Sequence, residues 1–298
     1  MKTIGIVFRT AILLIVSCSL MSAQAVQSGY VNVGPDKIYY ETAGAGPVII
    51  LIHDGIVHSA IWDEQFAEFA KSHKVIRYDR RGYGRSSAPT VAYSHMDDLN
   101  SLFAQWKIER ACLMGMSSGG RLAIDFTLQY PQKVNALVLV GAVVGGFPYT
   151  DHMLTRGGHL PAGLTDMEKS RAWYVAEDPY EIYAENKAAK ERVKEFVKKY
   201  PHREGPPAKR DEAREGARAK QDEAPAKPSY TRLGEIKIPA LILVGEFDMP
   251  DCHAHAGAIN AGIANSKRAI IPKSGHLIPI EQPVLFNDAV MKFLKDLT

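Results

Sequence analysis

One serine of this sequence stands in a pattern that is typical of a nucleophile. Ser117 has glycines two residues before it and two residues after it, in the stretch Leu113-Met114-Gly115-Met116-Ser117-Ser118-Gly119-Gly120. An apolar, strand-like run leads into this stretch and helical spacing follows it, which is the context of a nucleophile elbow. A sharp turn strains the backbone of a serine, and glycines at these positions remove side chains that would clash. The same pattern also occurs in helix caps, but the strand and helix around it favour a nucleophile.

A serine hydroxyl needs a base to remove its proton, and a carboxylate must hold that base in one tautomer. His276 alone among ten histidines combines a late position, a predicted post-strand loop and a neighbouring glycine. Asp248 follows the apolar run 240–244 and would lie at the same end of the sheet. Glu246 and Asp251 are alternative acids, the first directly after that run and the second beside the next predicted helix. We therefore expect Ser117, Asp248 and His276 to form the triad.

The tetrahedral intermediate of acyl transfer carries a negative oxygen that needs backbone amide donors. One donor would be the amide of Ser118, which lacks the two flanking glycines of a nucleophile. The other would come from the loop that follows the run 48–52, where His53-Asp54-Gly55-Ile56 contains a flexible glycine. We expect Gly55 and Ser118 to form the oxyanion hole.

A metal centre is the alternative interpretation of a second group of side chains. His253 and His255 lie beside Asp251 and Cys252, and all four are types that bind metals. A His-x-His spacing fits no familiar helical site, and the start of a solvated helix explains it better. We expect neither a metal nor a cofactor. Of the three cysteines, Cys252 is expected in a polar loop and Cys112 in the core, which is too few for a disulfide framework.

Short apolar runs alternate with amphipathic segments, which predicts an α/β fold with a mostly parallel sheet. The expected strands are 48–52, 74–78, 111–114, 136–140, 240–244 and 268–271, each buried on both faces. The expected helices are 61–70, 96–106, 120–129 and 282–297. Two strand-like pieces, 30–33 and 37–41, flank the turn Gly34-Pro35-Asp36 and predict an antiparallel hairpin before the parallel strands.

The strand rhythm stops after Gly145, and residues 145–230 are expected to form a helical lid inserted between core segments 26–144 and 231–298. Its part 201–229 has almost no large apolar side chain and is expected to be mobile or weakly helical. Aromatic residues in the first part, above all Trp173 and Tyr174, could line a substrate pocket, and ordinary packing within the lid is the alternative.

Residues 1–25 resemble an export signal, with a charged start, an apolar stretch and small residues at Ala23-Gln24-Ala25. The apolar stretch is shorter than the ~20 residues that a membrane-spanning helix needs. Cleavage would leave a protein in the periplasm or outside the cell. Ile15-Val16-Ser17-Cys18 also fits a lipoprotein box, in which lipidation of Cys18 would attach the chain to a membrane. The net charge of +3 is spread along the chain without a basic stripe, so nucleic acid is not an expected partner.

Five ordered motifs make the core similar to the α/β-hydrolase family, nearest to its small esterase, enol-lactonase and haloperoxidase-like members. They are Leu51-Ile52-His53-Asp54-Gly55 with Trp62-Asp63, Tyr78-Asp79-Arg80-Arg81-Gly82-Tyr83-Gly84-Arg85-Ser86, the elbow, Leu243-Val244-Gly245-Glu246-Phe247-Asp248, and Gly275-His276 with Glu281-Gln282-Pro283. The resemblance implies the same triad, oxyanion amides and helical lid. Asp54 departs from it, since many relatives have glycine there, and its carboxylate could repel anionic substrates or alter the oxyanion geometry.

A serine at the elbow argues against the aspartate-nucleophile branches of the family. The expected function is therefore hydrolysis of a small carboxylic ester or lactone through an acyl-enzyme on Ser117. Two alternatives stay open. One is a hydrolase of carbon-carbon bonds or a perhydrolase that uses the same triad, and the other is a protein that binds a ligand in this fold without turnover.

Overall fold

The computed structural model describes residues 25–91, 93–156, 167–178, 182–184, 186–200 and 227–297. The predicted export signal and Cys18 lie outside these residues, as does nearly all of the predicted mobile segment 201–229. Within the described parts, no helix is both long enough and apolar enough to cross a bilayer.

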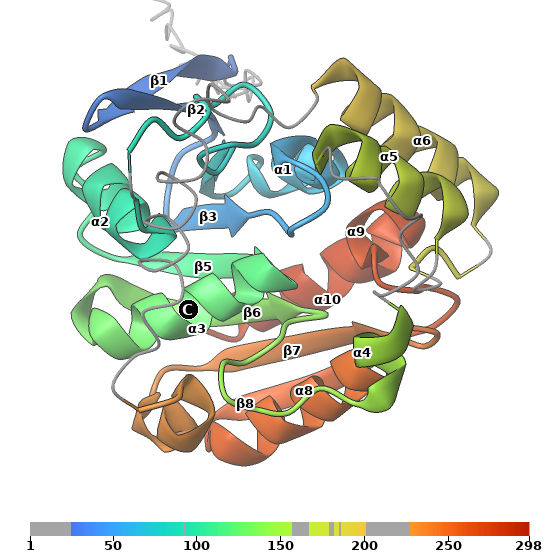
Figure 1. Cartoon of the computed structure of the whole chain (residues 1–298). Helices are drawn as coiled ribbons and strands as arrows, with labels where there is room; N and C mark the ends of the chain where they lie inside the picture. Colours follow the sequence, from blue (N-terminus) through green and yellow to red (C-terminus); the bar gives the residue numbers. More distant parts are fainter. Residues whose placement is uncertain are drawn as a thin grey trace, which may run out of the picture.

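One sheet of eight strands forms the centre of the molecule, in the order β1-β2-β4-β3-β5-β6-β7-β8 (Figure 1). The strands are β1 (Gln27–Val33), β2 (Asp36–Ala43), β3 (Val48–Ile52), β4 (Lys74–Tyr78), β5 (Ala111–Met116), β6 (Val134–Val140), β7 (Ala240–Gly245) and β8 (Ser266–Ile271). The first two form the predicted antiparallel hairpin, β2 runs antiparallel to β4, and all later pairs are parallel. The predicted α/β class and mostly parallel sheet are confirmed.

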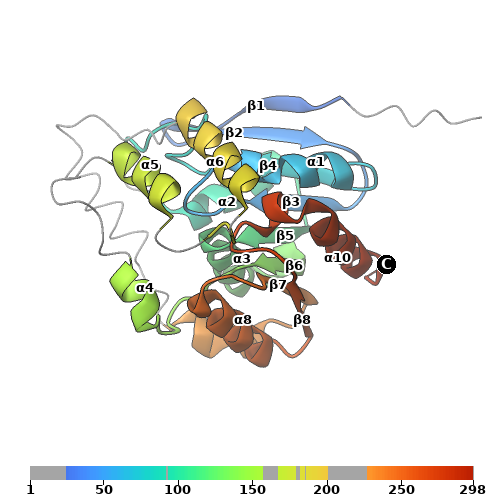
Figure 2. The same ribbon diagram turned by 90° about the vertical axis from the view of Figure 1, so that its right-hand side faces the viewer.

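Helices cover both faces of the sheet, as Figure 2 shows. On one face, α1 (Asp63–Phe69) packs against α10 (Pro283–Lys295) and α9 (Ile278–Glu281). On the other face lie α2 (His95–Gln105), α3 (Ser118–Gln129) and α8 (Pro250–Gly262). The 3-10 segment η5 (Ser229–Glu235) packs against α3 and α8. The region predicted as helix 61–70 begins instead as a 3-10 turn, η1 (Ser59–Trp62), which the side chain of His58 caps.

The central strands are apolar throughout because helices bury them on both sides. All six residues of β5 and of β7 are buried. The prediction that β8 is buried on both faces is wrong: most of its residues are exposed or half-buried, and the side chain of Ile270 is 53% exposed. This strand is the edge of the sheet and has a partner on one side only.

The described residues of the segment 145–230 form three helices, α4 (Asp151–Arg156), α5 (Met167–Glu177) and α6 (Lys187–Lys199). They lie at the end of the sheet toward which the parallel strands point (Figure 1). Since loops that follow parallel strands also meet at this end, the insertion and the predicted site residues occupy the same side of the molecule.

Candidate active site

Ser117 lies between β5 and α3 on a strained turn, with φ 51° and ψ −117°. Its backbone amide donates to the Val140 carbonyl oxygen at 2.9 Å, which ties the turn to the neighbouring strand β6. A Cβ on Gly115 would clash with the backbone of Gly119. A Cβ on Gly119 would in turn clash with the backbone that follows β3. The glycines that flank the serine are therefore required by close backbone contacts, as the sequence predicts.

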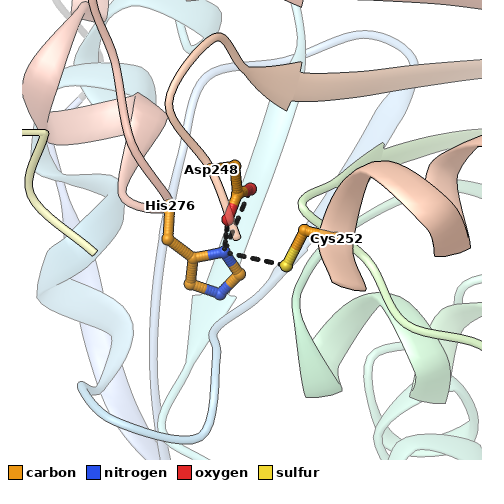
Figure 3. Close-up of side chains that lie close together, drawn as sticks. All are labelled: Asp248, Cys252 and His276. Atoms are coloured by element: carbon orange, nitrogen blue, oxygen red, sulfur yellow. Dashed lines mark hydrogen bonds and ion pairs between the residues drawn. The ribbon is translucent and has the colours of Figure 1, made fainter. Parts of the chain in front are cut away.

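His276 and Asp248 form a buried pair (Figure 3). Nδ1 of His276 lies 2.9 Å and 3.2 Å from the two carboxylate oxygens of Asp248. Burial alone would lower the pKa of this histidine, but the charge of Asp248 and the hydrogen bond to it raise that pKa well above 6.5. With Nδ1 directed at the carboxylate, Nε2 remains as the proton acceptor.

The two rival acids have other partners. The exposed Glu246 accepts a hydrogen bond from the backbone amide of Lys273 at 2.8 Å. Asp251 accepts from the amide and the hydroxyl of Thr150, at 2.6 Å and 2.7 Å. Of the three carboxylates that the sequence allows, Asp248 is therefore the one that contacts the candidate base.

Ser117 and His276 are brought to the same end of the sheet, but no hydrogen bond of 3.5 Å or less joins their side chains among the described residues. In ligand-free hydrolases such a contact is often long and shortens when substrate binds. The geometry therefore supplies a positioned acid and base, with the serine on the adjacent elbow.

The peptide between Asp54 and Gly55 is held by its carbonyl oxygen. This oxygen accepts hydrogen bonds from the guanidinium of Arg80 and from Nδ1 of His53, the second at 2.8 Å. Burial and the charge of Arg80 keep the pKa of His53 well below 6.5, so this ring is neutral and its Nε2 can accept from the Arg80 amide at 2.9 Å. In a trans peptide the N–H points opposite to the carbonyl, so these two donors fix the direction of the Gly55 N–H.

The predicted oxyanion amides are both available. Within the described parts of the chain, neither the Gly55 nor the Ser118 amide donates a hydrogen bond. The two residues are also neighbours, since a Cβ on Gly55 would lie 3.3 Å from the hydroxyl oxygen of Ser118. That hydroxyl accepts from Arg80 at 3.1 Å, so the same guanidinium contacts both halves of the candidate oxyanion hole.

Asp54, the departure from the family pattern, is fully buried and shapes the same loop. Its Oδ1 accepts hydrogen bonds from the amides of Ile56 and Val57, at 2.8 Å and 2.6 Å. These two hydrogen bonds fix the backbone of the turn, which a glycine at position 54 would leave more flexible.

The loop that carries His276 is held from two sides, by residues that sequence reasoning did not single out. The carbonyl of Ile182, from the insertion, accepts from the amide of His276 at 2.8 Å. Glu281 accepts from the amides of Gly275 and Leu277, at about 3.0 Å each. Burial raises the pKa of Glu281 to about 7, although these amide donors lower it. The Glu281-Gln282-Pro283 motif was a signal for this role, whereas nothing in the sequence marks Ile182.

A mostly apolar pocket lies between the oxyanion loop and α6. Its lining residues include Ile56, Val57 and Tyr83 from the core, Val197 from α6, and Tyr200, which directly follows that helix. Trp173 and Tyr174, which were expected to line a substrate pocket, are not among its lining residues. Their rings contact each other, with centroids 5.2 Å apart.

Two expectations about α8 are wrong. Cys252 is not in a polar loop but in this helix, fully buried, and His255 is fully buried rather than solvated. The ring of His255 accepts a hydrogen bond from the Val144 amide at 3.1 Å, which ties the helix to the segment after β6. Cys252 and Cys112 are both free thiols.

Comparison with known proteins gives consistent matches along the chain. A family model described as alpha/beta hydrolase fold matches residues 47–283. The chain is 28% identical to a putative 2-succinyl-6-hydroxy-2,4-cyclohexadiene-1-carboxylate synthase of Bacillus subtilis, over 89% of this chain and 98% of the relative. It is also 28% identical to a 2-hydroxy-6-oxononadienedioate/2-hydroxy-6-oxononatrienedioate hydrolase of Paraburkholderia phymatum, over 91% and 96%.

Solved structures give the same fold. Est816, described as an N-acyl homoserine lactone degrading enzyme, is 25% identical with a TM-score of 0.69, covering 89% of this chain and all of that one. A thermophilic esterase from Thermogutta terrifontis is 22% identical with a TM-score of 0.71, covering 91% and 99%.

Proposed function

This chain belongs to the α/β-hydrolase family and is a hydrolase of small molecules, and we propose that it cleaves a small carboxylic ester or lactone through an acyl-enzyme on Ser117. The observation that carries this proposal is the buried His276–Asp248 pair beside a serine on a strained elbow.

In the proposed reaction, Nε2 of His276 takes the proton of Ser117 as the serine oxygen attacks the carbonyl carbon. The amides of Gly55 and Ser118 stabilise the negative oxygen, each by about 2.7 to 4 kcal/mol as measured for similar donors. His276 then gives its proton to the leaving alkoxide and activates the water that cleaves the acyl-enzyme. For a lactone, the leaving alkoxide stays attached to the acyl group.

The apolar side chains of Ile56, Val57 and Val197 beside the oxyanion loop support a partly apolar substrate, although the pocket that they line, at about 10 Å³, has room for only one water molecule. Helix α6 supplies part of its wall, which supports the proposed lid role of residues 145–230. We propose a secondary, substrate-orienting role for Trp173 and Tyr174 on the neighbouring helix α5, which packs against α6.

The test is hydrolysis of p-nitrophenyl esters of increasing acyl length by the full chain, with the Ser117→Ala and Ser118→Ala variants beside it. We expect turnover by the wild type and by the Ser118 variant, since the backbone amide of residue 118 is retained, and no turnover by the Ser117 variant. Turnover that survives in Ser117→Ala, or a folded wild type without activity on any ester or lactone, would contradict the proposal.

A hydrolase of carbon-carbon bonds is the second candidate, because the match to the Paraburkholderia phymatum enzyme extends over nearly the whole of both chains. It would use the same serine and histidine. The assay monitors cleavage of a 2-hydroxy-6-oxodienoate through the loss of its dienol absorbance. Cleavage of this compound without turnover of any ester would favour this candidate. Retention of a ligand without product would instead favour a binding protein.

We also propose that the chain is exported, through cleavage after residue 25 or lipidation at Cys18. The charged start, apolar stretch and small residues support export. Mass spectrometry of the N-terminus of protein recovered from the expressing bacterium distinguishes a chain that begins at Val26 from one with a lipidated cysteine.

A further inference from the structure

The proposed mechanism makes no use of Cys252, although this thiol lies against the base. The residue is in the first turn of α8 and is fully buried. Its Sγ is 3.5 Å from Nδ1 of His276, on the side of the ring that faces Asp248 (Figure 3). Burial raises the pKa of this thiol to about 12, so by itself it is an unreactive, neutral group.

Sulfur, nitrogen and carboxylate oxygen converge here as a potential set of metal ligands. One donor atom from each of Asp248, Cys252 and His276 can be chosen so that all three lie within 4.8 Å of one another. Ligands at the bond lengths of tetrahedral zinc are about 3.2 to 3.6 Å apart. The Nδ1–Sγ distance of 3.5 Å and the longer Nδ1–carboxylate distance of 3.2 Å fall in that range. The third distance, from Sγ to the carboxylate, is at most 4.8 Å, and any excess over about 3.6 Å must close when the cation binds.

Charge also favours a divalent cation at this position. A thiolate and a carboxylate together carry two negative charges, which a divalent cation neutralises, and the imidazole binds as a neutral ligand. The complex would therefore have no net charge. A neutral complex suits a fully buried site because burying a net charge costs free energy. A water molecule would complete the coordination.

We infer that Asp248, Cys252 and His276 form an inhibitory site for a thiophilic divalent cation such as Zn²⁺. The cation takes the place of the proton on Nδ1, and the thiol of Cys252 loses its proton to solvent. The neutral ring then carries its proton on Nε2, which becomes a donor and can no longer accept the proton of Ser117. Because all three ligands are buried, we expect inhibition to develop slowly after the cation is added.

Metal binding is tested with Co²⁺, which reports a cysteine ligand through its thiolate charge-transfer absorption. The protein is the untagged full chain with Cys18→Ser, so that only Cys112 and Cys252 remain. Cys112→Ala is the matched control, since this thiol is also buried but lies in β5, among apolar side chains. We expect one equivalent of Co²⁺ and a charge-transfer band in the parent and in Cys112→Ala, and neither in Cys252→Ala. A band that persists in Cys252→Ala, or its absence from the folded parent, would overturn the site.

Circular dichroism checks the fold of each variant, and Cys252→Ser replaces Cys252→Ala if the alanine variant does not fold. The inhibitory effect rests on the proposed function, whereas Co²⁺ binding does not, so the two can fail separately. With Zn²⁺ present, fluorophosphonate labelling of Ser117 should slow by roughly 10²-fold or more, as for loss of a general base. Each variant is compared with its own metal-free rate, and a chelator should restore labelling. An unchanged rate in metal-loaded protein would refute inhibition even if Co²⁺ binds.

Discussion

Gly141 offers a way to displace the base without altering any group that reacts. It follows β6 with φ +48°, and its amide donates to the Leu243 carbonyl at 2.8 Å. A Cβ at this position would lie 2.9 Å from Cε1 and Nδ1 of His276 and 3.0 Å from Oδ2 of Asp248. Ordinary contacts begin near 3.4 Å, so the imidazole must shift by about half an ångström.

Two effects are therefore expected from Gly141→Ala. The positive φ costs about 1 to 2 kcal/mol of folding free energy when the residue has a side chain. The displaced imidazole should lower kcat by roughly 10- to 100-fold, since a misplacement of 1 Å can cost about 10²-fold. Steady-state hydrolysis of a p-nitrophenyl ester gives kcat, and urea unfolding gives the stability.

Matched glycine substitutions separate strain from displacement. Gly34 has φ +63° and nothing within 4 Å of an added Cβ, so Gly34→Ala should cost similar stability but leave kcat unchanged. Gly234 has no positive φ and also faces open space, so Gly234→Ala should change neither quantity. If folded Gly141→Ala keeps more than about half of the wild-type kcat, the observed position of His276 is not the one that reacts.

Three further predictions concern the supports of the site. Arg80→Met removes one of two side-chain donors from the carbonyl that orients the Gly55 amide, so kcat should fall by roughly 10²-fold with little change in KM; a change in KM alone would contradict this. The value of kcat/KM should rise with pH, and the midpoint of this rise should lie above pH 6.5, because Asp248 raises the pKa of His276 above that value. In Asp248→Asn the midpoint should fall, because the carboxylate charge that raises this pKa is lost while burial still lowers it; an unchanged midpoint in pH–rate profiles would assign it to another group. Burial raises the pKa of Glu281 from 4.5 to about 7, so its stabilising contribution is complete below pH 4.5 and is lost as the pH rises through 7. Across that window the free energy of unfolding should fall by about 3 kcal/mol more in the wild type than in Glu281→Gln, and equal pH dependence in urea unfolding would refute this.

The fold was largely predictable because its signals are local. Buried parallel strands are continuous apolar runs, and the predicted strand 74–78 has the bounds that β4 has in the structure. The turn between β1 and β2 was marked by Gly34-Pro35-Asp36. Burial of β8 was mispredicted because an apolar run does not reveal whether its strand lies at the centre or at the edge of a sheet.

Contacts between distant parts of the chain could not be predicted in the same way. Spacing alone left Glu246, Asp248 and Asp251 as candidate acids, and only the fold determines which carboxylate contacts His276. The polar sequence around Cys252 suggested a loop because the hydrogen bonds that allow polar residues of α8 to be buried come from elsewhere in the chain.

The role of Arg80 was hidden for another reason. Its place in a charged motif is visible in the sequence, but its contacts with the Asp54 carbonyl and the Ser118 hydroxyl depend on two other loops. Ile182 acts through its backbone carbonyl, so no side-chain pattern could mark it.

Covalent labelling of the nucleophile tests the central claim most directly. The full chain is treated with a fluorophosphonate probe, digested with trypsin, and the peptide of residues 111–121 is sequenced by mass spectrometry. We predict a single adduct on Ser117, retained in Ser118→Ala and lost in Ser117→Ala. An adduct on Ser118, or no adduct on residues 111–121 of the folded protein, would contradict the assignment of Ser117 as the nucleophile.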